Sequence, residues 1–129
     1  PDYNPAEVQY LSVTDINESI DVFSYYGHTD KFHKQDQNEK SYLVTKKYED
    51  VKDDIQSGFK IIGNSDAFAY PYGEYNKSTL KILKELDTDI AFTIKDGMAS
   101  PSDSRLEIPR RGIYPGITLD IFEKLITYE

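Results

Sequence analysis

The feature that most constrains the fold is the stretch DAFAYPYGEYN at residues 66–76. Its first half alternates aromatic residues with alanines, which suits a buried β-strand. Pro71 ends strand pairing because it has no N–H for the ladder, and Gly73 permits backbone angles that a side chain would forbid. Asn76 is a typical helix N-cap. The stretch therefore predicts a strand, a tight turn and the start of a helix at residue 77.

A turn of this kind stands where ligands bind in α/β folds, at the carboxyl end of a strand. An ordinary βα connection that packs aromatic side chains also explains the turn, because Pro-x-Gly turns are common. The pattern alone favours the ordinary connection and leaves the ligand site open.

The remaining pattern predicts helices that alternate with short strands. The apolar stripe of the long central segment recurs at spacings of three and four, which indicates an amphipathic helix that Gly63 closes. This order predicts a parallel sheet with right-handed crossovers, and either a (β/α) barrel or an open doubly wound sheet fits it. The expected elements are a helix at 11–20 capped by Ser12 or Thr14, a strand at 22–26 that Gly27 ends, a helix from Ser41 or Thr45 to Gly63, a helix at 77–86 with Leu80, Leu83 and Leu86 inward, a strand at 90–93 buried on both faces, a strand at 106–108 and a helix at 117–128.

Composition excludes several classes of protein. The chain has 129 residues, which suits a single domain with a modest core. Its formal charge of −8 disfavours nucleic acid as a partner, and no apolar run approaches the ~20 residues of a membrane helix. Cysteine is absent, so disulfides and thiolate chemistry are excluded. The chain begins at Pro1, so we expect a fragment or processed piece, with any export signal upstream.

The candidate metal ligands in the sequence are two histidines. His28 and His33 are the only ones in the chain, five positions apart after a predicted strand. Neutral imidazole is the commonest side-chain ligand for zinc, but this spacing is a weak pattern, and by itself it favours two exposed loop histidines. Asp30 lies between them as a ligand, a partner of a ligand or a surface residue. Two histidines alone do not complete a catalytic site.

Three blocks together carry a family resemblance: GHT with His33 at residues 27–33, FAYPYG at 68–73, and LEIPR at 106–110. In order and spacing they resemble the polysaccharide deacetylases of the NodB-homology class, carbohydrate esterase family 4. Within that class they are similar to the branch that de-N-acetylates poly-N-acetylglucosamine. The resemblance runs over residues 11–128. It implies an α/β fold, a partial (β/α) barrel with parallel strands and flanking helices.

The resemblance implies a divalent metal, zinc above all, with His28 and His33 as ligands and Thr29 fixing their loop. The metal would polarise the acetamide carbonyl and activate a water. The substrate would be an N-acetylated glycan such as poly-N-acetylglucosamine, a chitooligosaccharide or peptidoglycan. An extracellular or cell-surface location, at the cell wall, follows from the same resemblance.

The aromatic block implies the remaining site residues. The backbone N–H of Tyr72 would face the oxyanion, and Tyr70, Pro71 and Tyr72 would line the substrate site, although core packing is the commoner use of such rings. In many family members an arginine is the partner of the catalytic base. This chain has Ala69 at that position, so the usual partner is absent. Arg110 is the candidate for that role.

The sequence also departs from the family pattern. The T-F-D-D block that supplies the base and the third metal ligand is missing, since Thr14 and Asp15 sit in a helical context. The late block with the general acid is also missing, and Asp120 stands where a histidine is usual. A full barrel takes about 250 residues. We therefore expect residues 1–129 to be a single domain, the C-terminal portion of a catalytic domain.

Two hypotheses about function remain. The first is metal-dependent de-N-acetylation of a polysaccharide containing N-acetylglucosamine, as a hydrolase, with little activity in this chain alone. The alternative is a non-catalytic remnant or glycan-binding module on the same scaffold. Half a barrel leaves strand edges and an apolar face unpaired, so we expect a homo-oligomer or pairing with an N-terminal segment.

Overall fold

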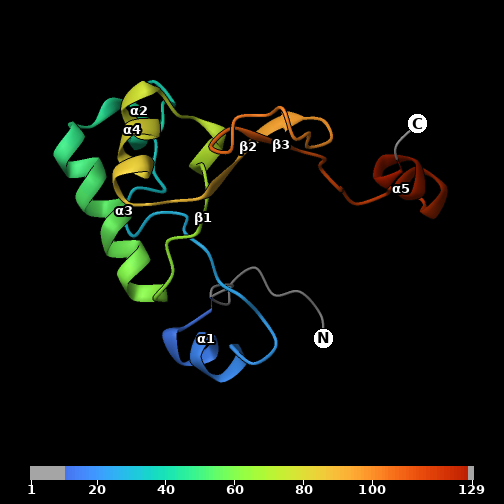
Figure 1. Cartoon of the computed structure of the whole chain (residues 1–129), viewed down its shortest axis with the longest axis horizontal. Coiled ribbons are helices and arrows are strands. Elements are labelled where there is room, and N and C mark those ends of the chain that lie inside the picture. The colour runs from blue at the N-terminus through green and yellow to red at the C-terminus, as the bar shows by residue number, and fades with distance from the viewer. Residues whose placement is uncertain (1–10, 128–129) are drawn as a thin grey trace.

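A computed structural model describes residues 11–127 of the chain (Figure 1). Three strands, β1 (Ala67–Ala69), β2 (Ile90–Asp96) and β3 (Ile108–Arg110), form a parallel sheet in the order β1-β2-β3. Helices α2, α3 and α4 lie together on one side of these strands (Figure 1). The predicted α/β architecture of parallel strands with flanking helices is confirmed.

The outer side of β1 is paired at a single residue. Gly27 forms an isolated parallel bridge with Phe68, in which its N–H donates to Ala67 C=O (3.0 Å) and its C=O accepts from Ala69 N–H (2.9 Å). The strand predicted at residues 22–26 is wrong, since those residues form none. Gly27 is required because a Cβ there would lie 2.2 Å from the ring of Phe59. The bridge brings the segment that follows Gly27 alongside β1.

The long predicted helix is two helices. Ser41 caps the short α2 (Tyr42–Thr45), and α3 (Tyr48–Ile62) begins after two extended residues. Gly63 ends α3 with a left-handed φ of 69°, as predicted. The apolar face of α3 is buried against the sheet and against the helix that follows β1.

That following helix, α4 (Lys77–Glu85), begins at the predicted cap. The Asn76 side chain accepts from Thr79 N–H at 3.0 Å. Ile82 and Leu83 are fully buried, whereas the predicted inward residues Leu80 and Leu86 are only partly buried. The buried core comprises Leu43, Val51, Ile55, Phe59, Phe68, Tyr70, Ile82, Leu83, Ala91 and Leu106.

Strands β2 and β3 differ from expectation. β2 extends to Asp96 and is buried on one face only, because Ala91 and Thr93 are enclosed while Ile94 is 65% exposed. β3 begins two residues later than predicted and includes Pro109. Proline is tolerated there because β3 is the edge strand of the described sheet and its missing N–H faces outward.

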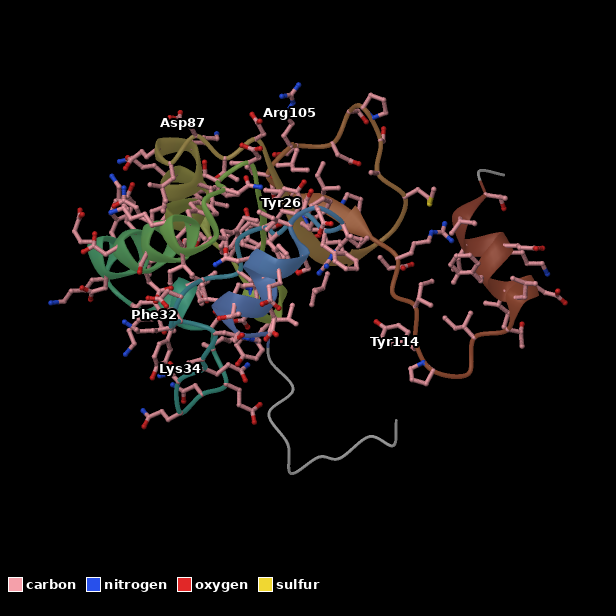
Figure 2. The ribbon with its side chains drawn as sticks, turned by 90° about the horizontal axis from the view of Figure 1, so that it is seen from below. Tyr26, Phe32, Lys34, Asp87, Arg105 and Tyr114 are labelled. Atoms are coloured by element: carbon pink, nitrogen blue, oxygen red, sulfur yellow. The ribbon has the colours of Figure 1, made fainter. Side chains whose placement is uncertain are left out.

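Two helices stand apart from the sheet. Helix α1 (Val13–Ser19) begins at a capping box between Ser12 and Asp15, which confirms one of the two predicted caps. Helix α5 (Leu119–Ile126) begins two residues later than predicted and is joined to β3 by the segment that passes Tyr114 (Figure 2). The last residue of the predicted helix, Tyr128, lies outside the described residues. Neither helix contributes a buried residue. None of the helices within residues 11–127 has both the length and the apolar character needed to cross a bilayer.

Candidate active site

His28 is held by the backbone of β1. Its Nδ1 lies 2.7 Å from the Ala69 carbonyl oxygen. Because a carbonyl only accepts, Nδ1 carries the proton and the lone pair is on Nε2. The surrounding protein desolvates the ring and lowers the pKa of His28; the bond to Ala69 opposes this, and the charges of His33 and Arg110 add to it. At neutral pH the ring is therefore in the form that binds metals.

His33 lies beside His28 although five residues separate them. The two ring centroids are 4.7 Å apart with an edge-to-face angle of 74°. The centroids of the Tyr72 and His33 rings are 4.8 Å apart, and the Tyr72 hydroxyl donates to His33 C=O at 3.2 Å. Both imidazoles remain open to solvent. Two blocks that are 39 residues apart thus meet at the carboxyl end of β1.

The turn after β1 has an unusual backbone at Tyr72. Its φ of 57° and ψ of 8° are left-handed, which costs a non-glycine residue roughly 1–2 kcal/mol. The turn closes through Gly73 N–H to Tyr70 C=O (2.9 Å) and Glu74 N–H to Pro71 C=O (3.1 Å). Within residues 11–127, these bonds leave the Tyr72 N–H without an acceptor. Residues with strained backbone cluster at active sites and ligand clamps.

Tyr70 and Pro71 do not line an open surface. Tyr70 is 2% exposed, stacks on Tyr75 at 4.5 Å and donates its hydroxyl to Leu106 C=O at 2.8 Å. Burial raises the pKa of the Tyr70 phenol well above its usual range. Pro71 is also buried. Both side chains are buried among the described residues whereas the Tyr72 ring is exposed, and contact of Tyr70 and Pro71 with substrate stays a prediction.

Arg110 approaches the site from β3. Its Nε donates to Thr93 C=O at 2.8 Å, which fixes the side chain across β2. Its positive charge also contributes to the lowered pKa of His28. Asp120, by contrast, lies in the first turn of α5, outside the sheet.

The two imidazoles suit a divalent ion as a partial site. Their donors are of the type that zinc prefers, and the Ala69 contact supplies the outer hydrogen bond that orients such ligands. The Asp30 carboxylate instead accepts from Ser57 Oγ at 2.9 Å. Among residues 11–127, no cluster of three or more His, Cys, Asp or Glu could hold a metal. The described residues thus provide two ligands of a site.

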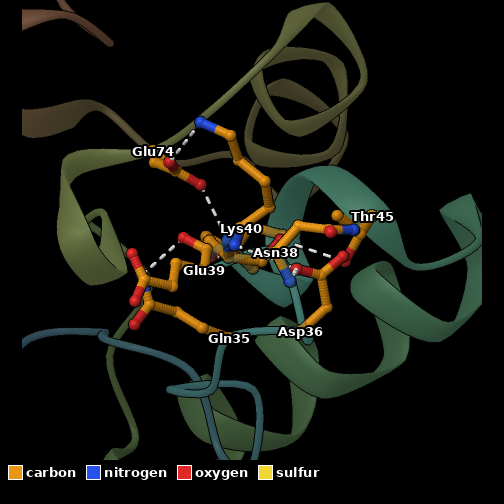
Figure 3. A network of polar contacts seen from close by, with 9 residues as sticks. Gln35, Asp36, Asn38, Glu39, Lys40, Thr45 and Glu74 are labelled. Atoms are coloured by element: carbon orange, nitrogen blue, oxygen red, sulfur yellow. Dashed lines mark hydrogen bonds and ion pairs between the residues drawn. The ribbon is translucent and has the colours of Figure 1, made fainter.

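Two carboxylates that support this site carry no clear sequence signal. Asp54 of α3 binds the backbone between the histidines. Glu74 accepts from Ser41 N–H at 2.7 Å and from Lys40 Nζ at 3.2 Å (Figure 3). Asp54 could have been noticed as a charged residue on the apolar face of α3, whereas nothing local marks Glu74.

Solved structures with a similar overall backbone identify the fold. IcaB from Ammonifex degensii matches with a TM-score of 0.69 and 25% identity, over 81% of this chain and 48% of that one. The Streptococcus pyogenes deacetylase PplD in complex with acetate matches with a TM-score of 0.78 and 23% identity, over 92% and 51%. The chain has a polysaccharide-deacetylase fold. The BpsB deacetylase domain from Bordetella bronchiseptica shares this deacetylase fold at a TM-score of 0.68 and 16% identity, over 79% and 48%.

The match to the deacetylase fold is partial in length. The chain spans about half the length of the solved structures it matches. No model of a protein family matches the sequence. No curated protein matches it either.

Proposed function

We propose that this chain is the metal-binding part of a glycan de-N-acetylase, a hydrolase that cleaves the acetamide C–N bond of N-acetylglucosamine units in a polysaccharide. The observation that carries the proposal is the meeting of His28, His33 and Tyr72 at the carboxyl end of β1. The deacetylase fold of the matched structures supports it. On this proposal residues 1–129 form the C-terminal portion of the catalytic domain.

Each site residue then has a defined task. A divalent ion, zinc first among the candidates, would supply Lewis-acid chemistry toward the acetamide carbonyl. His28 would offer Nε2, because its Nδ1–H is engaged by Ala69. The Tyr72 N–H would donate to the oxygen that gains charge, and one such donor contributes about 3–4 kcal/mol. Arg110 would be the partner of the catalytic base, by resemblance to the family.

Substrate, location and assembly are part of the proposal. An N-acetylated surface glycan would place the protein outside the cell or at the cell wall. Apolar side chains on α1 and α5 are exposed, among them Val13 (57%) and Leu119 (69%). We propose that these faces are covered in a homo-oligomer or by the remainder of the domain.

Calorimetry with Zn²⁺ on the wild type, His28→Ala and Lys31→Ala tests the metal site. Lys31 is the matched control, since it lies between the histidines with a side chain that is 78% exposed. We expect the wild type and Lys31→Ala to bind Zn²⁺ equally and His28→Ala to bind at least tenfold more weakly. Equal binding by all three would remove the metal site from the proposal. Binding of chitooligosaccharide by a protein that binds no Zn²⁺ would favour the alternative, a non-catalytic glycan-binding module.

A further inference from the structure

The buried carboxylate of Asp54 binds the loop that carries both histidines. Asp54 is 8% exposed and lies on the same face of α3 as the core residues Val51 and Ile55. A carboxylate at such a position is costly unless it is hydrogen-bonded. Its Oδ2 accepts from Asp30 N–H at 3.1 Å and its Oδ1 from Lys31 N–H at 2.8 Å. Both carboxylate oxygens are therefore committed to two consecutive backbone N–H groups of the histidine loop.

The loop is shaped to present these two N–H groups to α3. Thr29 has a left-handed φ of 77°, which turns the backbone just before them. Gly58 lets the loop approach the helix, since a Cβ at this position would lie 3.0 Å from the Thr29 carbonyl carbon. Ser57 Oγ donates to the Asp30 carboxylate at 2.9 Å and adds a third contact from the same face. Asp54, Ser57 and Gly58 of α3 thus hold the segment at residues 29–31.

These contacts hold the backbone that lies between the two imidazoles. Asp30 and Lys31 lie between His28 and His33, in a segment without helix or strand. His28 is fixed independently by Ala69, whereas the exposed His33 ring lies against the rings of His28 and Tyr72. The backbone between the two rings is therefore held by its hydrogen bonds to Asp54.

We propose that Asp54 is a positioning residue for the His28–His33 pair, acting through the two backbone N–H groups between them. This inference deepens the proposed function and relies on it only for the ligand of the pair. Removal of the carboxylate should let the loop move and separate the rings. Loss of such outer support weakens metal binding by about 10–100-fold in other sites.

The test compares Asp54→Ala, Asp54→Asn and Asp53→Ala in the full chain. Asp53 is the matched control, because it is the adjacent, exposed carboxylate on the same helix. NMR of the imidazole nitrogens of His28 and His33, without metal, reports ring geometry, and Zn²⁺ calorimetry reports affinity. We expect Asp54→Ala to shift both imidazole signals and weaken Zn²⁺ binding at least tenfold. Asp54→Asn, with one acceptor oxygen left, should be intermediate, and Asp53→Ala should match the wild type.

The outcomes separate this inference from the proposed function. Imidazole signals that move in the Asp54 variants, in a protein that binds no Zn²⁺, support positioning and contradict the metal site. Signals and affinity identical to those of Asp53→Ala overturn the positioning role. Hydrogen exchange of the Asp30 and Lys31 amides in the wild type needs no variant. Strong protection is expected, and exchange at the rate of an open loop would overturn the proposal even if the variants fail to fold.

Discussion

Replacing Glu74 by alanine should release the segment that follows His33 from the turn that carries Tyr72. The Glu74 carboxylate accepts from Ser41 N–H at 2.7 Å, and Ser41 is fully buried. It also pairs with Lys40 at 3.2 Å (Figure 3). The substitution removes both contacts and leaves a buried backbone N–H without a protein partner.

The two contacts differ in strength. A hydrogen bond to a charged group contributes about 1.5–3 kcal/mol to stability. A buried donor that is left without a hydrogen-bond partner costs about as much. The Lys40 side chain is 61% exposed, so its ion pair contributes roughly 0–1 kcal/mol. We expect Glu74→Ala to lower the free energy of unfolding by about 2–3 kcal/mol and Glu74→Gln, which keeps a neutral acceptor, by about 1 kcal/mol. Lys40→Ala should cost about 0.5 kcal/mol or less.

Urea unfolding at neutral pH, followed by circular dichroism, measures these differences if the m-value stays constant. The order Glu74→Ala, Glu74→Gln, Lys40→Ala is the decisive result. A Glu74→Ala protein no less stable than Lys40→Ala would refute the reasoning, because it would mean that the Ser41 contact contributes nothing.

The same contact predicts a pH dependence, since the Ser41 N–H lowers the pKa of Glu74 below its ordinary 4.5. The stability advantage of the wild type over Glu74→Gln should be complete above pH 4.5 and shrink as the pH falls through the folded pKa; an advantage that persists in acid would contradict it. Tyr70→Phe should cost about 1–2 kcal/mol in urea unfolding, because it leaves Leu106 C=O buried and unpaired. Tyr26→Phe, at an exposed position, is its control, and equal stability of the two variants would count against the Tyr70 bond.

Features with a local chemical cause could be predicted from the sequence. Asn76 begins α4 because its side chain caps the first turn, and Gly63 ends α3 because it accepts a left-handed φ. The parallel pairing of β1 with β2 follows from the helix α4 between these two short segments. The proximity of His28 and His33 was expected from the family resemblance, and the rings do lie together.

Features imposed by distant contacts could not be predicted. A tyrosine at φ 57° runs against local sterics, and contacts from the His33 segment accompany it. Gly27 pairs with β1 through a single bridge, and the ring of Phe59 leaves room only for a glycine at that position. Asp54 acts on backbone N–H groups, which any residue provides, so its partners leave no trace in the sequence.

The contact between His28 and the main chain of residue 69 has a consequence for genetics. Any amino acid at position 69 presents the same carbonyl, so this interaction survives every substitution there that preserves the strand. Mutational scanning will therefore score the position as permissive and overlook its part in orienting the imidazole. An ester in place of the peptide bond that contains this carbonyl, introduced by chemical synthesis, would weaken the acceptor. The same change removes the Tyr70 N–H that donates to Phe92 C=O at 3.2 Å, so the contribution of His28 is the difference between the ester's effect in the wild type and in His28→Ala.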